Sequence, residues 1–282
     1  MKFVPDLKKL SALTAKIKRL KMDIGFVPTM GALHEGHFSL INKARKENDI
    51  VIVSIFVNPA QFGRGEDFKK YPRSFKKDIA ACRKLGVDFV FLPEKEDMYP
   101  QGYSTFIDLE GLSGRLCGAF RPGHFRGVAT VVAKLLNIIH PDTLYLGQKD
   151  AQQAIIISRM IKDLNFPVKV RILPTQRQKD GLALSSRNAY LSKQERAGAT
   201  VLFKALQLAE FLISNGQRDS GRIISRMKEL IQKNKQARIE YIAIVETGQL
   251  KDIKKVEPGC LIALAVKIGK TRLIDNTIIG CA

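Results

Sequence analysis

The chain has 282 residues, of which 45% are hydrophobic and 26% are charged, and its 47 Lys and Arg against 27 Asp and Glu give a formal net charge of +20. This composition supports a sizeable core in one large domain or two unequal ones, and it excludes wholesale disorder. No apolar run approaches the ~20 residues of a membrane span, the N-terminal lysines argue against a secretory signal, and the cysteines Cys82, Cys117, Cys260 and Cys281 form no CxxC pair, which indicates a reducing, cytoplasmic setting.

The positive charge is spread along the chain, with no basic tail and no long block of like charges. A charge of this size is typical of proteins with polyanionic partners, such as nucleic acid, an acidic membrane surface or a phosphorylated substrate. The chain has no Trp and no basic-aromatic interleaving of the kind that stacks bases. We therefore interpret the charge as solvated basic helix faces and expect neither a nucleic-acid nor a membrane partner.

Helices and strands alternate in the predicted order up to residue 173. A basic N-terminal helix precedes a strand at Ile24–Pro28, and the largely β-branched run Ile50–Val57 is typical of a strand buried on both faces of a parallel sheet. The other predicted elements are strands at Val87–Leu92, Thr143–Leu146 and Val168–Leu173, and helices around Phe38–Lys46 and at Ser74–Leu85, His124–Ile139 and Ala151–Leu164, with a loop-rich stretch at 93–123. The alternation predicts an α/β fold, a Rossmann-like doubly wound parallel sheet whose ligands lie at the carboxyl ends of the strands.

The pattern changes after residue 188. Ser192 and Glu195 form a capping box that opens a helix through Ile213. A helix at Arg222–Gln232 follows, and then strands at Ile239–Val245 and Cys260–Val266, the last followed by Lys270–Ile274. This pattern predicts a smaller α+β C-terminal lid domain, and we place the domains at residues 1–176 and 177–282.

Two histidines follow the first long strand in the segment His34-Glu35-Gly36-His37. At the start of a helix, residues i and i+3 point the same way, and the free N–H groups of the helix N-terminus attract anions. Gly36 lets a nucleotide approach the backbone closely. The segment predicts a site for a phosphate chain. The alternatives are a metal site, which would need a third ligand and lacks HExxH spacing, and two surface histidines.

A second motif, Gly147-Gln148-Lys149-Asp150, follows the strand Thr143–Leu146, and its lysine suits a phosphate contact. An ordinary turn with Asp150 as N-cap is the alternative. Either Gln152 or Gln153 is expected to face the cleft.

A third motif, KDGLALSSRN at Lys179–Asn188, offers two hydroxyls and an arginine, which binds phosphate oxygens bidentately. It lies at the junction of the two units, where a mobile lid is expected, and a polar linker is the alternative.

Two further segments lie at the same predicted sheet edge. Asn58 and Gln61, after the strand Ile50–Val57, are candidates for holding the carboxylate and hydroxyls of a small substrate, and a plain Asn-Pro turn is the alternative. Arg121 opens the segment RPGHFRG, which adds anion donors before a helix. The joint placement of these five segments predicts a nucleotide-binding α/β enzyme with a basic lid.

These motifs also resemble a known family. The segments VPTMGALHEGH, FVNPAQF, YPR, RPGHFRGV, GQKDAQQ and KDGLALSSRN, in this order, closely resemble the pantothenate synthetases (pantoate–β-alanine ligases), a family of the nucleotidyltransferase superfamily with an HxGH signature. The match runs from about Val27 to Asn188, and RLIDN at Arg272–Asn276 extends it to nearly the whole chain.

The resemblance implies an AMP-forming ligase. ATP, (R)-pantoate and β-alanine give pantothenate, AMP and diphosphate through a pantoyl-adenylate. The implied fold is a Rossmann-type domain with a smaller C-terminal lid, usually in a homodimer. Mg²⁺ is implied as well. Asp78 matches a position sometimes assigned to this ion, but its neighbour Lys77 speaks against a protein-bound metal, so we expect ATP phosphates and water to hold it.

The resemblance also implies which residues form the site. His37 would be the proton donor, with His34, Lys149 and Arg187 supplying positive charge for adenylation. Gln61 and Gln153 would hold pantoate, and Gln61 would also touch β-alanine. Asn58 and Arg121 join the expected pantoate site from their placement at the same sheet edge. The ATP site would comprise Met30, Gly31, Ala32, Leu33, His34, Glu35, Gly36, His37, Gly147, Gln148, Lys149, Asp150, Gln176, Leu184, Ser185, Ser186 and Arg187.

The chain departs from the family pattern at Ala60, Gln148, Ala151 and Gln176, which bears on pocket shape. Two rival functions remain at this point. One is a nucleotidyltransferase that stops after nucleotide transfer, and the other is a non-catalytic RNA-binding protein suggested by the charge. The paired glutamines and SSRN weigh against the first, and the second leaves HEGH and GQKD unexplained.

Overall fold

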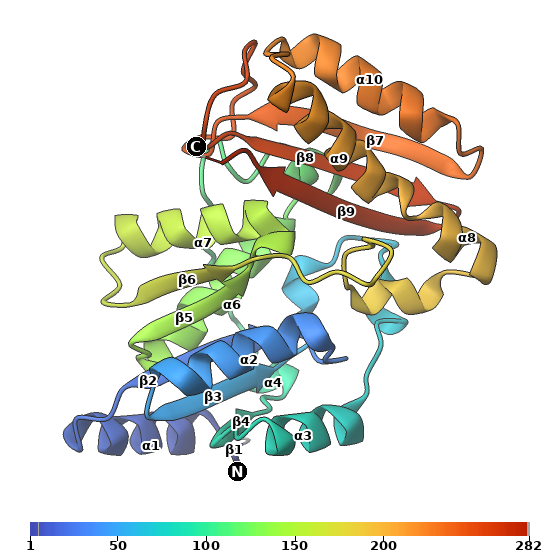
Figure 1. Ribbon diagram of the computed structural model, residues 1–282. Helices are drawn as coiled ribbons and strands as arrows, with labels where there is room; N and C mark the ends of the chain where they lie inside the picture. The colour runs from blue at the N-terminus through green and yellow to red at the C-terminus, as the bar shows by residue number, and fades with distance from the viewer. Residues whose placement is uncertain (5, 281–282) are drawn as a thin grey trace.

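Six parallel strands form the larger sheet of the computed structural model, which describes residues 1–4 and 6–280 (Figure 1). Its strand order is β1-β4-β3-β2-β5-β6. The strands are β1 (Lys2–Val4), β2 (Ile24–Thr29), β3 (Ile50–Ile55), β4 (Phe89–Phe91), β5 (Thr143–Gly147) and β6 (Lys169–Leu173). Because the chain moves outward from β2 to β4 and then returns to place β5 beside β2, the topological switch point lies between β2 and β5. Ligands of such sheets bind at the carboxyl ends of the strands near this point.

Helices cover both faces of this sheet. One face packs against α1 (Leu7–Arg19), α6 (His124–Ile139) and α7 (Ala151–Asp163), and the other against α2 (Glu35–Glu47) and α3 (Phe75–Lys84). Along β3, Ile52 belongs to the first core, whereas Val51 and Val53 belong to the second. This two-sided burial explains why the strand sequence is apolar at successive positions.

A three-stranded antiparallel sheet with the order β7-β8-β9 forms the C-terminal unit. One of its faces packs against α9 and α10, and the other contributes Val245, Leu261 and Ala263 to a core shared with Phe125 and Ile156 of the first unit. The unit therefore rests on an apolar interface and sits over one end of the larger sheet (Figure 1). Its elements are α8 (Lys193–Gly198), α9 (Val201–Ser214), α10 (Ser220–Gln232), β7 (Ala237–Val245), β8 (Leu261–Ile268) and β9 (Thr271–Ile278).

The structure confirms the predicted fold class, a doubly wound α/β sheet with a smaller α+β unit. It differs from the predicted elements in three places. Strand β1 stands where the sequence pattern predicts only helix, and α4 (Lys95–Met98) and α5 (Cys117–Phe120) lie inside the loop-rich stretch. The helix expected from Ser192 through Ile213 is divided into α8 and α9. At the break, the carbonyl of Gly198 accepts a hydrogen bond from the side chain of Asn234 (3.2 Å), and the N–H of Leu202 bonds to Ala199 instead of Gly198.

The domain boundary between residues 176 and 177 stays a prediction. Three observations support it. The larger sheet ends at Leu173, and Leu182 already belongs to the core of the C-terminal unit. Arg177, the first residue of the proposed second domain, is ion-paired with Asp275 of β9.

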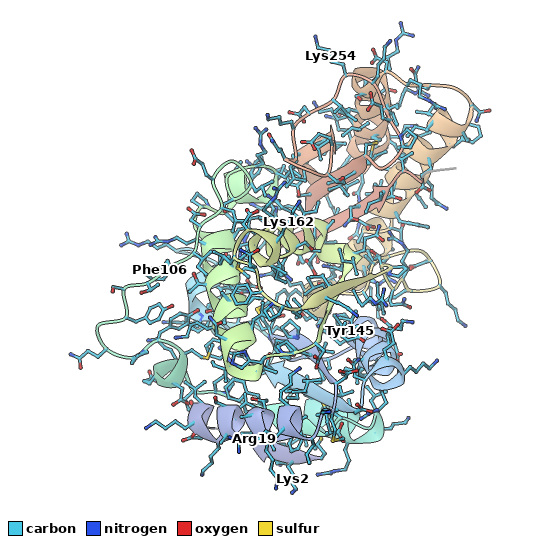
Figure 2. All side chains as sticks on the ribbon, turned by 90° about the vertical axis from the view of Figure 1, so that its left-hand side faces the viewer. Lys2, Arg19, Phe106, Tyr145, Lys162 and Lys254 are labelled. Atoms are coloured by element: carbon cyan, nitrogen blue, oxygen red, sulfur yellow. The ribbon has the colours of Figure 1, made fainter. Side chains whose placement is uncertain are left out.

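The basic side chains are dispersed over the surface. Lys2, Arg19, Lys162 and Lys254 project from different elements (Figure 2). Cys82, Cys117 and Cys260 are free and buried, and Cys281 lies outside the described residues.

The helical stretch Lys193–Ser214, which comprises α8 and α9, has the length and the mean hydropathy, 1.3, that would suffice to cross a membrane. The sequence pattern predicts a helix here but no membrane span. Its apolar side chains Leu202, Leu206 and Ile213 pack into the core of the C-terminal unit, which is typical of a core helix.

Candidate active site

The main cleft, a cavity of about 220 Å³, lies at the carboxyl ends of β2, β3 and β5 and is closed above by the chain segment before α8. The structure brings the five predicted segments together there. Five expected residues, Gly31, Ala32, Leu33, Glu35 and Gln148, do not line the cleft but shape the backbone beside it. Those that do line it are Met30, His34, Gly36, His37, Asn58, Gln61, Arg121, Gly147, Lys149, Asp150, Gln153, Gln176, Leu184, Ser185, Ser186 and Arg187.

The loop between β2 and α2 is held by a buried carboxylate from α3. Gly31 and Ala32 both have left-handed backbone conformations, with φ of 80° and 50°. Asp78, 2% exposed, accepts hydrogen bonds from the backbone N–H groups of Ala32 (2.9 Å) and Leu33 (2.8 Å). Both of its oxygens are thereby used, so Asp78 fixes the loop that delivers His34 to the start of α2.

His34 and His37 cap the N-terminus of α2 with their own rings. Nδ1 of His34 accepts from the N–H of Gly36 (3.1 Å), and Nδ1 of His37 accepts from the N–H of His34 (3.3 Å). Because a neutral imidazole has one donor and one acceptor, each ring carries its proton on Nε2. The rings lie side by side, with centroids 4.2 Å apart.

Both histidines are neutral at neutral pH. Burial lowers the pKa of His34 to about 4, and the neighbouring Lys149 lowers it as well. Burial lowers the pKa of His37 to about 3. The rings therefore carry Nε2–H groups that can donate to an anion, and the expectation that His37 is the proton donor stays a prediction.

Lys149 lies in the single 3-10 turn Gln148–Asp150, between β5 and α7. Its ammonium is 3.5 Å from the carboxylate of Asp150, and its side chain is 20% exposed. Asp150 occupies the N-cap position of α7, as the ordinary-turn alternative predicts, but its side chain makes no capping hydrogen bond. The turn therefore leaves the side chains of both residues lining the cleft.

Arg187 is held by an acid that the sequence analysis had not singled out. Its Nε and Nη2 donate to the two oxygens of Asp67, both at 2.8 Å, and its guanidinium lies 5.9 Å from the ring centroid of Tyr71. Burial alone would raise the pKa of Asp67, but the hydrogen bonds and the charge of Arg187 lower it below its usual value. The hydroxyls of Tyr71 and Ser186 are 3.0 Å apart. The segment 66–71 thus contacts the SSRN motif through Asp67 and Tyr71.

The amide of Asn58 is fully used within the protein. Its Oδ1 accepts from the N–H of Ala60 and the hydroxyl of Tyr99, and its Nδ2 donates to Oε1 of Gln61 (3.2 Å) and to the carbonyl of Gly127 (3.1 Å). At 1% exposure, Asn58 positions Gln61 instead of offering free groups to a ligand. A Cβ at Gly127 would lie 2.2 Å from the carbonyl oxygen of Ala60, so only glycine allows α6 to pack this closely on the turn.

Arg121 is likewise occupied. It donates to both oxygens of Glu66, at 2.8 and 2.6 Å, and to the carbonyl of Gln61 at 3.2 Å. Nδ1 of His124 is 2.8 Å from the same carbonyl. Glu66 and Asp67, adjacent in sequence, therefore each neutralise one arginine of the cleft.

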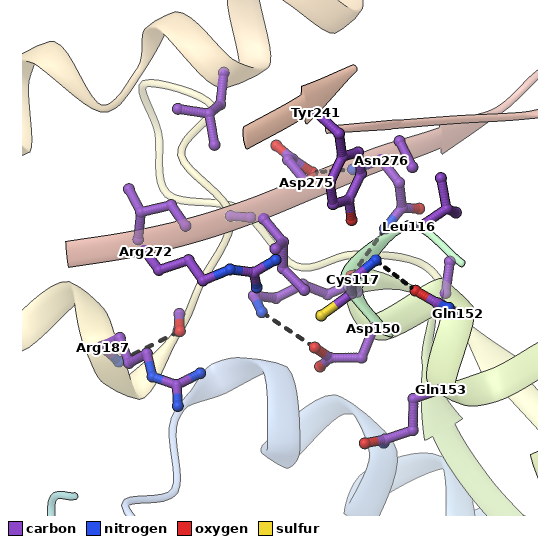
Figure 3. A pocket seen from close by; sticks show the side chains of 18 of the residues that line it. Leu116, Cys117, Asp150, Gln152, Gln153, Arg187, Tyr241, Arg272, Asp275 and Asn276 are labelled. Atoms are coloured by element: carbon purple, nitrogen blue, oxygen red, sulfur yellow. Dashed lines mark hydrogen bonds and ion pairs between the residues drawn. The ribbon is translucent and has the colours of Figure 1, made fainter. Parts of the chain in front are cut away.

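The two glutamines at the start of α7 have different tasks. Gln153 lines the main cleft, whereas Gln152 is 8% exposed and is tied to the segment 112–117 by hydrogen bonds to the N–H of Cys117 and to the carbonyls of Leu112 and Arg115. Figure 3 shows Gln152 bonded to the backbone near Cys117, whereas Gln153 points away from it. The figure is centred on a second cavity, the junction cavity, which shares Gln153 with the main cleft and is also lined by Arg272 and Tyr241.

An apolar wall completes the main cleft. Val128, Val131 and Val132 of α6 line it together with Phe56 and Phe62. The sequence analysis missed these side chains because they have the same 3.6-residue spacing as the core residues of α6.

The described residues offer no ready-made metal site. No group of three His, Cys, Asp or Glu side chains among them is arranged to hold an ion. Asp78, the one candidate from the resemblance, has both oxygens bonded to backbone N–H groups. The protein therefore does not fit a resident Mg²⁺ ion at this position.

A stability measurement tests the role of Asp78. Asp78→Ala leaves two backbone N–H groups without partners, so we expect the free energy of unfolding to fall by about 1–3 kcal/mol in urea titrations. Asp163→Ala, which breaks only a surface ion pair with Arg159, is the matched control and should cost under about 1 kcal/mol. If both variants are equally stable, the carboxylate of Asp78 does not hold the loop.

Three comparisons place this geometry among known proteins. The family profile described as "Pantoate-beta-alanine ligase" matches residues 2–278. Curated proteins named pantothenate synthetase are 50% identical in Caldicellulosiruptor bescii, covering 99% of each chain, and 51% identical in Fervidobacterium nodosum, covering 100% of each. The crystal structure of pantothenate synthetase from Thermus thermophilus superposes with a TM-score of 0.94 at 41% identity over 100% of both chains. The Francisella tularensis ligase, "Complexed with Beta-gamma ATP and Beta-alanine", covers 99% of this chain and 97% of its own at 39% identity and a TM-score of 0.82.

Proposed function

The chain belongs to the pantoate-beta-alanine ligase family, and from this we propose that its main cleft is where ATP activates pantoate. The enzyme joins (R)-pantoate to β-alanine through a pantoyl-adenylate and releases pantothenate, AMP and diphosphate. One observation carries the assignment of the cleft. Two neutral histidine donors, Lys149 and the Ser185–Arg187 segment line a single cavity at the switch point of the sheet.

In this assignment, the triphosphate lies across the N-terminus of α2. The Nε2–H groups of His34 and His37 donate to phosphate oxygens at this positive end of the helix dipole. Lys149 approaches from β5, and Arg187, Ser185 and Ser186 approach from the segment above the cleft. Gln176, whose carbonyl accepts from the N–H of Leu184 (3.0 Å), lines the same cavity and keeps its family role as an ATP contact.

Pantoate occupies the part of the cleft near Gln61 and Gln153. Their amides suit its carboxylate and hydroxyls, and the apolar wall of α6 suits its two methyl groups. Asn58 donates to Gln61, and Arg121 is paired with Glu66. We therefore assign both residues to positioning the pantoate site rather than to contacting pantoate. Gln61 also faces the incoming amine of β-alanine.

The two steps need positioning and positive charge but no protein nucleophile. A pantoate carboxylate oxygen forms a bond to the α-phosphorus as the bond to the β-phosphate oxygen breaks, and diphosphate leaves. The amine of β-alanine then attacks the acyl carbon, loses a proton and displaces AMP. Lys149, Arg187 and the histidine donors offset the like-charge repulsion of the first step. Cys82, Cys117 and Cys260 need no role in the chemistry.

Three further assignments complete the proposal. Mg²⁺ enters bound to the oxygens of ATP as part of the substrate, since the carboxylate that the resemblance offers, Asp78, has both oxygens bonded to backbone N–H groups. The enzyme works in the cytoplasm, and it forms a homodimer, as the family resemblance implies. Sedimentation of the purified chain tests the dimer.

Isotope exchange tests the proposed chemistry. If the carboxylate attacks the α-phosphorus directly, then pantoate alone supports exchange of labelled diphosphate into ATP, and β-alanine alone does not. We also expect AMP to accumulate slowly without β-alanine, because the closed segment 66–71 shields the adenylate from water.

The same assay can contradict the mechanism. Transfer of the γ-phosphoryl group would release ADP and exchange no diphosphate. ADP as a product, or an exchange that requires β-alanine, would therefore rule out the adenylate.

A further inference from the structure

Strand β9 of the C-terminal unit touches both phosphate-binding segments of the main cleft. We propose that two adjacent residues of this strand, Asp275 and Asn276, are positioning residues that set the placement of Lys149 and of the SSRN segment for adenylation. The inference rests on the proposed function, because it concerns the same cleft.

Asn276 holds the turn that carries Lys149. Its Nδ2 donates to the carbonyl of Gln148 (3.0 Å) and to that of Lys149 (2.8 Å), across 127 residues of sequence. The residue is 4% exposed. Both donor hydrogens of one buried amide are thus directed at one turn, whose backbone position determines where the side chain of Lys149 begins.

Asp275 holds the other segment through Arg177. The two form a bidentate ion pair, at 2.6 and 2.9 Å, and the side chain of Asp275 is 1% exposed. Arg177 also donates to the carbonyl of Gly181 (3.1 Å) and stacks on the ring of Phe203 of α9, 4.5 Å from its centroid.

Arg177 opens a tight loop that leads directly to Ser185. The N–H of Leu184 bonds back to Gln176 (3.0 Å), and Arg177 is bridged to Ala183. Because the loop is closed on itself, fixing Arg177 also fixes the residues that follow Leu184. Two neighbouring residues of one strand therefore set the spacing between Lys149 and Arg187, on opposite sides of the triphosphate.

Replacement of Asn276 tests this role. Asn276→Ala removes both donors, and we expect pantoate-dependent diphosphate exchange to fall about 10- to 100-fold, since a misplacement of about 1 Å can cost about that much. The second step, started by adding β-alanine to enzyme preloaded with ATP and pantoate, should change less than about threefold because it does not depend on the position of Lys149. If Asn276 only stabilised the fold, its removal would lower the fraction of active enzyme, and both steps would slow by the same factor.

Thr277→Ala is the matched control. It removes a hydrogen bond from the next residue of β9 to Glu210 (2.6 Å), within the C-terminal unit, and should keep exchange within about twofold of the parent. If Asn276→Ala fails to fold, Asn276→Ser keeps one hydroxyl donor, and it should still lose exchange because one short donor cannot hold both carbonyls. Parent-like exchange in the Asn276 variants, or equal slowing of both steps, overturns the inference. A lack of pantoate-dependent exchange in the parent and in Thr277→Ala instead overturns the proposed function.

Discussion

His37→Ala should lower kcat/KM for ATP by about 10²- to 10³-fold, the usual loss when a preorganised donor to developing negative charge is removed. His37 lines the cleft, and its Nδ1 accepts the N–H of His34. The variant loses one helix-capping bond and, in the proposed arrangement, a phosphate donor. Steady-state kinetics of the purified variant at several ATP concentrations measure the loss.

The pH dependence gives a second measure of His37. Burial lowers its pKa to about 3, below the ordinary value of 6.5, so the unfolded chain binds the proton more readily than the folded one. The stability that depends on the neutral ring is complete above pH 6.5 and is lost as the pH falls toward 3. We therefore expect His37→Ala to lose less unfolding free energy than the parent between pH 7 and pH 4.

A histidine outside the cleft is the control for both measurements. His140 is exposed at the C-terminal end of α6 with φ of 49°, and Asn tolerates that conformation, so His140→Asn should keep full activity. Full kcat/KM in His37→Ala would show that the ring makes no contact that strengthens in the transition state.

Lys149→Ala and Arg187→Ala should each slow adenylate formation by about 10²- to 10³-fold, with a smaller effect on amine attack. Both cations lie where diphosphate leaves in the proposed arrangement, and that charge has gone before β-alanine reacts. Rapid-quench single turnovers separate the two steps. Lys162→Ala, an exposed lysine of α7, is the control and should react as the parent does.

The ion pair between Arg187 and Asp67 allows a second test of the Arg187 assignment. Removing Arg187 leaves the carboxylate of Asp67 without its partner, beside the expected triphosphate. Part of the loss in Arg187→Ala should therefore come from this carboxylate, and adding Asp67→Asn should recover part of the rate. Equal slowing of both steps in Arg187→Ala, or no recovery in the double variant, would contradict the placement of Arg187 at the departing phosphates.

The amino-acid sequence by itself determined the fold class and the position of the cleft. Runs such as Ile50–Val57 are apolar on both faces, which only a sheet covered on both sides can bury, and βαβ connectivity then places the segment after each strand at one edge. Local spacing was sufficient for His34 and His37, because residues i and i+3 share a face at any helix start. Lys149 follows from a motif at a strand end, and Arg187 follows from a motif at the junction of the two units.

Only the tertiary structure decided how these side chains are held. Asp67 meets Arg187 across 120 residues, Asp78 meets Ala32 across 46, and Asn276 meets Lys149 across 127. Strand β1 likewise exists because β4 offers it a parallel edge. A hydrogen bond between distant residues depends on where folding brings their backbones, and no local periodicity encodes that. The sequence pattern therefore gave the groups that face the substrates, whereas the partners that fix and neutralise them follow from the packing of α3, β9 and the segment 66–71 around the cleft.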